Sequence, residues 1–307
     1  MRVKIFFVLA IFIVNCFGIQ SKVTEKSVLI KNGQIELPGT LTYTQDSKKL
    51  VIWIHGSGNV DRNGNQGATV KANYIKQFRD EVNKNDIAFF SYDKRTSNSK
   101  NAAFLKGVVL DDFVSDARKV IAYLKNENQF KEIILIGHSQ GSLVGMLASE
   151  GIDKYISLAG PSESIDVTIT KQVTAQSAEL GRVTASHFKE LQETGNVKEV
   201  NSNLISIFAA PNFPFLKNWM SYNPVEEIKK VKAPTLILNG TKDIQVSIED
   251  AQALTTANKK SELKIIEHMN HVLKHIEKDA DNMSSYYSPD FKISPELVKT
   301  ITQFINK

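Results

Sequence analysis

One serine stands in a sequence context that favours nucleophilic chemistry. Ser139 lies within Gly137-His138-Ser139-Gln140-Gly141, directly after a β-branched run and directly before apolar residues at helical spacing. A strand, a tight turn and a helix in that order are typical of a nucleophile elbow, in which small neighbours let a serine adopt a strained backbone conformation. The helix start supplies N–H groups and a positive dipole end to an oxyanion. We predict that Ser139 is a nucleophile; the alternative is a helix cap in an ordinary turn.

A serine hydroxyl needs a base, and the base needs an acid that orients it. In a doubly wound hydrolase sheet the acid precedes the histidine along the chain. Asp243 follows the predicted strand at 236–239, and open α/β sheets place functional groups at the carboxyl ends of their strands. We predict Asp243 as the acid. The alternatives are a turn or capping role for Asp243, with Asp250 as a rival from inside the next helix.

Three histidines follow the last predicted strand at 263–266, namely His268, His271 and His275. His271 is the predicted base, because it lies in the loop beyond the strand and ahead of the final helix. His268 is the main rival, and His275 is expected at the surface. His138, beside Ser139, is expected to pack or to form a hydrogen bond rather than to act as the base.

An oxyanion hole needs two backbone donors. The first is predicted to be the N–H of Gln140, the residue after the nucleophile. The second is expected in the loop after the predicted buried strand at 50–54, where His55-Gly56-Ser57-Gly58 stands. We predict the N–H of Ser57; the alternative is a glycine-rich turn without a catalytic part.

Alternating strand and helix patterns predict the framework that positions these residues. A hairpin is expected at Asn32-Gly33, with a break in its second strand at residues 37–40. Beyond it, apolar strands alternate with helices, which implies an α/β fold with a mostly parallel sheet and helices on both faces. Residues 161–224 interrupt this alternation with two or three helices. We predict a core at 19–160 and 225–307 and a helical lid at 161–224; extra core helices are the alternative.

The composition describes a globular protein. The chain has 307 residues, with 42% hydrophobic residues, 23% charged residues and a net charge of +5. This fits one large α/β domain, or a domain with an insertion. The lysines are scattered without interleaved aromatic residues, so a solvated basic surface is expected and nucleic acid is not an expected partner. No oligomeric state follows from the pattern.

The N-terminus has the pattern of a secretory signal peptide at residues 1–18. A short basic start precedes an uncharged apolar run at 5–14, and small or polar residues lead to Gly18. We expect cleavage after Gly18 and export to a periplasm or the exterior. The alternatives are a lipid anchor at Cys16, in a segment that resembles a bacterial lipobox, and a buried N-terminal element. Cys16 is the only cysteine, so the processed chain would have no disulfide and no thiol nucleophile.

Together these motifs resemble the α/β-hydrolase superfamily, and more narrowly bacterial esterases and serine-aminopeptidase-like hydrolases. The resemblance covers residues 50–307. His55 to Gly58, followed by the Asp-Arg-x-Gly-Asn element at 61–65, matches that group. The segment 92–95, Tyr-Asp-Lys-Arg, matches in part, and then Thr96 and Asn98 stand where glycines are usual, so a different loop conformation is expected there. Within 61–65, the aspartate and arginine are expected either to structure the loop or to lie at the surface.

The sequence therefore predicts an exported serine hydrolase that cleaves a carboxylic ester through an acyl-enzyme. A small-molecule ester is the expected substrate, and neither a metal nor an organic cofactor is needed. A peptidase or amidase is one alternative, with Glu163 or Asp166 receiving the substrate amine. A thioesterase is another. A non-catalytic binding scaffold is the third, and the complete set of Ser139, Asp243 and His271 argues against it.

Overall fold

The computed structural model describes residues 22–307, so the predicted signal peptide and Cys16 lie outside the described residues. Its core is an eight-stranded sheet in the order β1-β2-β4-β3-β5-β6-β7-β8. β1 pairs antiparallel with β2, β2 pairs antiparallel with β4, and all other neighbours are parallel, as predicted. The strands are β1 (Thr24–Asn32), β2 (Ile35–Tyr43), β3 (Lys49–Ile54), β4 (Ala88–Tyr92), β5 (Glu132–His138), β6 (Lys154–Leu158), β7 (Thr235–Gly240) and β8 (Glu262–Ile266).

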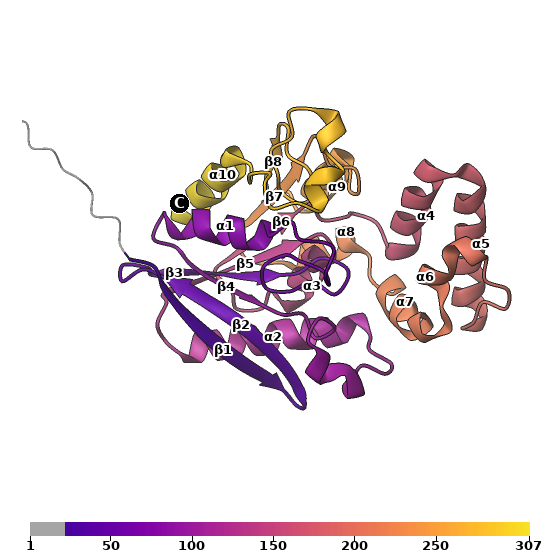
Figure 1. Ribbon diagram of the computed structural model, residues 1–307, viewed down its shortest axis with the longest axis horizontal. Helices are drawn as coiled ribbons and strands as arrows, with labels where there is room; N and C mark the ends of the chain where they lie inside the picture. The colour runs from indigo at the N-terminus through magenta and orange to yellow at the C-terminus, as the bar shows by residue number, and fades with distance from the viewer. Residues whose placement is uncertain (1–21) are drawn as a thin grey trace, which may run out of the picture.

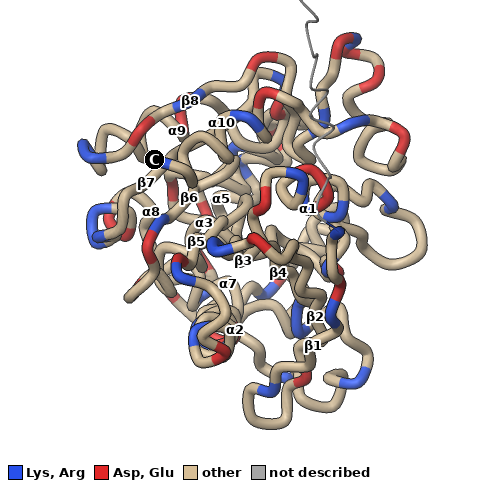
Figure 2. The backbone as a smooth tube through the Cα atoms, turned by 90° about the vertical axis from the view of Figure 1, so that its left-hand side faces the viewer, with Lys and Arg blue, Asp and Glu red and all other residues tan. Residues whose placement is uncertain are grey.

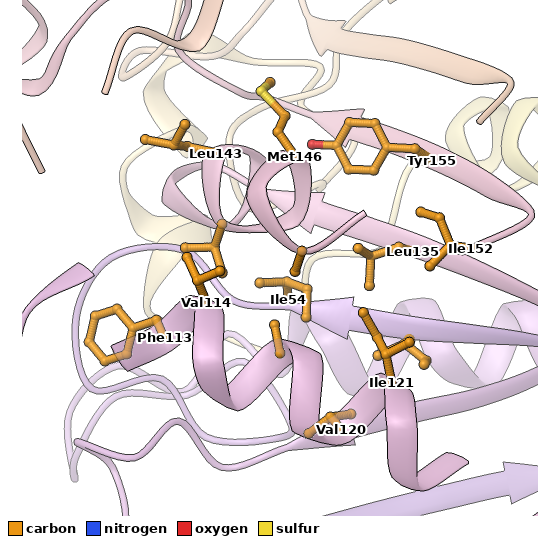
Figure 3. Packing of buried hydrophobic residues seen from close by; sticks show 14 of the residues in the cluster. Ile54, Phe113, Val114, Val120, Ile121, Leu135, Leu143, Met146, Ile152 and Tyr155 are labelled. Atoms are coloured by element: carbon orange, nitrogen blue, oxygen red, sulfur yellow. The ribbon is translucent and has the colours of Figure 1, made fainter. Parts of the chain in front are cut away.

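Helices cover both faces of this sheet (Figure 1). α1 (Tyr74–Asn83) and α10 (Pro295–Asn306) pack on one face, while α2 (Leu110–Asn126), α3 (Gln140–Ala148) and α9 (Ile248–Ala257) pack on the other. Successive side chains of β3 alternate between the two cores, with Ile52 in one and Trp53 in the other. Figure 3 shows the first of these cores, in which Ile121 of α2 lies near Leu135 of β5 and Val114 of α2 lies near Ile54 of β3.

Between β6 and β7 the chain leaves the sheet and forms a helical lobe, which lies beside the sheet in Figure 1. The lobe has a small apolar core of its own, separate from the two cores of the sheet. The predicted helical insertion is therefore confirmed, with helices between residues 165 and 230. These are α4 (Ile165–Gln176), α5 (Ala178–Thr194), η2 (Ser202–Leu204), α6 (Ile205–Phe208), η3 (Ala210–Asn212), α7 (Phe213–Met220), α8 (Pro224–Glu227) and η4 (Ile228–Lys230).

The predicted break at residues 37–40 is wrong, because β2 continues through Pro38 and Gly39. Pro38 lies just outside the ladder to β4, which pairs with β2 only from Gly39 to Thr42. Its carbonyl oxygen accepts a hydrogen bond from the N–H of Asp93 at 2.8 Å. A Cβ at Gly39 would lie 2.4 Å from Cζ of Phe90, so this glycine makes room for a ring of the neighbouring strand.

The remaining described elements are three short 3-10 helices: η1 (Ser99–Phe104), η5 (Asp279–Asp281) and η6 (Ser284–Tyr286). Charged residues of both signs are interspersed along the chain rather than gathered in one region (Figure 2). Within residues 22–307, none of the helices is both long enough and apolar enough to cross a bilayer.

Candidate active site

Ser139 occupies the turn between β5 and α3 with a strained backbone, φ 55° and ψ −123°. Glycines make this turn possible. A Cβ at Gly137 would lie 2.3 Å from the carbonyl oxygen of Gly141, and a Cβ at Gly141 would lie 2.3 Å from that of Ile54. The strand β5, the helix α3 and the strand β3 thus approach more closely than side chains at these positions permit. The predicted elbow geometry is present.

Asp243 and His271 come together from the loops after β7 and β8. His271 Nδ1 lies 2.8 Å from Asp243 Oδ2, and the two side chains are only 6% and 1% exposed, respectively. The other carboxylate oxygen of Asp243 accepts the backbone N–H groups of Gln245 and Val246 at 2.8 and 2.9 Å. Because the carboxylate is fixed in this way, it holds the imidazole with a proton on Nδ1, which leaves Nε2 as the basic atom.

His138 connects the His271 loop to the elbow. Its Nε2 lies 2.8 Å from the carbonyl oxygen of His271, and the two rings are 4.9 Å apart. Burial, aided by the neighbouring His271, holds the pKa of His138 well below its ordinary value, so the ring is neutral and Nε2–H donates. Within residues 22–307 the Ser139 hydroxyl has no hydrogen bond to His271; the two residues are linked through His138.

The two sequence rivals are placed differently. His268 is exposed, and its ring lies against that of His275 at 5.4 Å. Asp250 accepts hydrogen bonds from the N–H and hydroxyl of Ser162 at 2.8 and 2.7 Å. Its second oxygen completes a capping box with Ser247 at the start of α9. Asp250 is therefore used to anchor a helix and a loop.

The predicted oxyanion loop lies directly against the elbow. A Cβ at Gly56 would be 3.1 Å from Cβ of Ser139. Among the described residues 22–307, the backbone N–H groups of Ser57 and Gln140 donate to no protein acceptor. Both donors are thus available to a ligand, and that of Gln140 lies at the positive end of α3.

Hydrogen bonds and one ion pair hold the chain that follows this loop in a fixed conformation. Asp61 accepts the N–H groups of Asn63 and Asn65 at 2.8 and 2.9 Å, which closes the 61–65 turn. Arg62 forms a two-pronged pair with Asp93 at 2.9 and 2.6 Å. The residues of the Asp-Arg element therefore structure the loop. Neither Thr96 nor Asn98 has a positive φ, so that part of the chain has no need of glycine.

Comparison with known proteins places this chain in a family. Residues 39–257 match BD-FAE, the bifunctional feruloyl/acetyl xylan esterase family. This chain belongs to the BD-FAE family. The family consists of α/β hydrolases of the carboxylic ester hydrolase class. No curated protein sequence matches the chain.

Solved structures share the fold of this BD-FAE member at low sequence identity. Est1E from Butyrivibrio proteoclasticus is 17% identical with a TM-score of 0.58, over 92% of this chain and 99% of that one. The esterase Pf2001 of Pyrococcus furiosus is 17% identical with a TM-score of 0.58, over 92% and 90%. Proline iminopeptidase of Mycobacterium smegmatis is 13% identical with a TM-score of 0.57, over 92% and 98%. These likenesses show the α/β-hydrolase fold.

Lys94 is a residue of this site that the sequence prediction did not single out. Its Nζ donates to the carbonyl oxygen of Gly56 at 2.8 Å and to Oε1 of Gln140 at 2.7 Å. It also lies 4.3 Å from the ring centroid of Phe113. The residue is 5% exposed, and burial lowers the pKa of Lys94 to about 7. The one signal in the sequence is a lysine inside Tyr-Asp-Lys-Arg, directly after an apolar strand.

Proposed function

We propose that this BD-FAE member hydrolyses carboxylic esters with Ser139 as nucleophile, His271 as base and Asp243 as orienting acid. The observation that carries the proposal is the buried Asp243–His271 hydrogen bond, joined through His138 to the strained turn at Ser139. The family to which the chain belongs supplies the reaction class. The three roles are those of a Ser-His-Asp triad.

The proposed reaction proceeds through an acyl-enzyme. Ser139 Oγ attacks the acyl carbon while Nε2 of His271 takes its proton. The carbonyl oxygen becomes an oxyanion that the N–H groups of Ser57 and Gln140 receive. As the C–O bond to the alcohol breaks, His271 returns the proton to the leaving alcohol. Water then attacks the acyl-enzyme with His271 again as base, and the acid is released.

For the substrate we propose feruloyl or acetyl esters. The family name supports this class, and Est1E, a structural relative, has been solved with ferulic acid bound.

The lobe is proposed as a lid that borders the site, since Gln172 of α4 donates to the carbonyl oxygen of Gln245, two residues after Asp243, at 3.0 Å. For a peptidase, Glu163 is a weaker amine receptor, because it is paired with Lys171 at 2.6 Å. Export stays a prediction from residues 1–18.

The test is hydrolysis of methyl ferulate and of a chromogenic ester series from acetate to decanoate by residues 19–307. We expect Ser139→Ala, Asp243→Asn and His271→Ala each to lower kcat by on the order of 10⁴-fold, because loss of a triad member removes the nucleophile or its activation. His268→Ala is the matched control and should retain parental rates, because its ring is exposed and faces His275.

Three outcomes would contradict parts of the proposal. Loss of activity in His268→Ala but not in His271→Ala would move the base to His268. Turnover of dipeptide amides without turnover of esters would favour the peptidase. If neither series reacts and a fluorophosphonate fails to label Ser139, the chain is a binding scaffold on a hydrolase fold.

A further inference from the structure

The buried ammonium group of Lys94 joins the two segments that carry the proposed oxyanion donors. Its Nζ binds the carbonyl oxygen of Gly56 and the side-chain oxygen of Gln140. The carbonyl of Gly56 and the N–H of Ser57 belong to one peptide group, and Gln140 carries the other donor on its own backbone. A single side chain from the loop after β4 thus contacts both halves of the proposed oxyanion hole.

The first of these bonds fixes an orientation. The peptide between Gly56 and Ser57 is trans, so its C=O and N–H point in opposite directions. Lys94 holds the C=O from the buried side, which turns the N–H of Ser57 away from the core. The second bond holds Gln140, the first residue of α3, at a fixed place relative to that loop.

The surroundings of Lys94 leave no room for a substrate group beside its ammonium group. The cavity beside its ammonium group has a volume of about 10 Å³, which is at most one water molecule. Lining this cavity are Ile54, His55, Tyr92, Phe113, Asp116 and Val144. The charged groups near it are already paired, Asp116 with Arg95 and Asp93 with Arg62.

Lys94 can make its two hydrogen bonds in either protonation state. Among its titratable neighbours, His55 is neutral near pH 7 because burial lowers its pKa to about 4, and burial raises the pKa of Tyr92, so its phenol is also neutral. A neutral amine still carries two N–H groups, one for each acceptor. Both hydrogen bonds can therefore persist when Lys94 loses its proton.

We infer that Lys94 is a positioning residue of the oxyanion hole, whose two hydrogen bonds aim the Ser57 and Gln140 N–H groups at the developing oxyanion. The inference rests on the proposed function. Interactions that strengthen only in the transition state raise kcat without tightening substrate binding. Loss of the Lys94 ammonium should accordingly lower kcat and leave KM nearly unchanged.

The decisive variant is Lys94→Met, which keeps the length of the stem and removes both donors. We expect kcat for the best ester to fall by about 10- to 100-fold and KM to change by less than about threefold, because a catalytic donor displaced by about 1 Å costs up to about 10² in rate. Gln140→Met cuts only the second bond and should show a smaller loss. The double variant should be no slower than Lys94→Met, since both changes act on one bonded unit. Lys119→Met, an exposed lysine of α2, is the matched control.

Binding of a transition-state analogue separates positioning from simple loss of fold. A trifluoromethyl ketone forms a hemiketal oxyanion on Ser139, so its affinity should fall in Lys94→Met by the same factor as kcat/KM. The affinity of the product acid should stay at the parental value. Circular dichroism and urea midpoints report the fold, and Gln140→Met still tests one bond if Lys94→Met does not fold.

The outcomes distinguish the two proposals. A parent enzyme that hydrolyses no ester overturns the proposed function and this inference with it. An active parent, with a folded Lys94→Met variant of parental kcat or of unchanged affinity for the ketone, overturns the role of Lys94 alone. A double variant whose losses multiply would likewise show that Lys94 and Gln140 do not act as one unit.

Discussion

At the scale of single residues, burial decides which side chains near the site carry charge. His55 directly follows β3 and His138 lies within the elbow, and burial lowers the pKa of each below its ordinary value. His55 Nε2 bonds to the carbonyl oxygen of Tyr92, while its Nδ1 has no partner within the described residues. Protonation of His55 is costly because its second nitrogen has no acceptor, and burial keeps both rings neutral near pH 7.

Because His55 is buried as a neutral ring, we expect the free energy of unfolding to fall in acid. Its pKa is about 4 in the folded chain against 6.5 ordinarily, so the unfolded chain binds more protons between these values. This contribution is fully present above pH 6.5, falls progressively as the pH drops from 6.5 to 4, and is lost below pH 4. From pH 7 to pH 5 the free energy of unfolding should fall by about 2 kcal/mol through this group. Urea titrations at both pH values should show a smaller fall in His55→Asn; equal falls in parent and variant would contradict the prediction.

At the scale of elements, the sequence predicts what is local and misses what neighbours impose. Apolar patterns are local, so the strands, the main helices and the positions of Asp243 and His271 after β7 and β8 could be predicted. The continuation of β2 through Pro38 and Gly39 could not, because it depends on pairing with the neighbouring strands β1 and β4. Lys94 was missed for the same reason: its two acceptors become neighbours only when β3, β4 and α3 meet.

The pair between Arg95 and Asp116 holds the loop after β4 to α2. Arg95 reaches the Asp116 carboxylate at 2.7 and 2.8 Å, and the two side chains are 5% and 2% exposed. Asp116→Ala would leave the buried guanidinium with only Asp112 as a charged partner. We expect urea titration to show a loss of about 3 kcal/mol in the free energy of unfolding. Lys119→Ala, exposed on the same helix, should change it by less than about 0.5 kcal/mol. A loss in Asp116→Ala no larger than in this control would contradict the role of the pair.

At the scale of the whole molecule, the lobe has an apolar core of its own and also contributes side chains to one core of the sheet. Phe215 and Trp219 of α7 pack toward α2, with the Phe215 ring 5.7 Å from that of Phe113. Asp111, at the start of α2, accepts hydrogen bonds from Asn218 and from the Tyr222 hydroxyl. Burial, together with the Asp111 carboxylate, raises the pKa of Tyr222 to about 12, so this hydroxyl remains a donor. The sequence predicted the insertion but not this attachment, which depends on single polar residues with no pattern of their own.

We therefore expect the two hydrogen bonds to Asp111 to determine how firmly residues 213–222 are held against α2. Asp111→Ala removes both side-chain hydrogen bonds, each worth about 1 kcal/mol, and should speed amide exchange across residues 213–222 by about 30-fold. Exchange in β5 should stay at the parental rate, because that strand lies in the sheet. Glu296→Ala, which removes an exposed carboxylate of α10 paired with Lys299, is the control and should leave residues 213–222 protected. If amide exchange across residues 213–222 is equally slow in both variants, the apolar contacts of Phe215 and Trp219 hold the lobe to the sheet without help from Asp111.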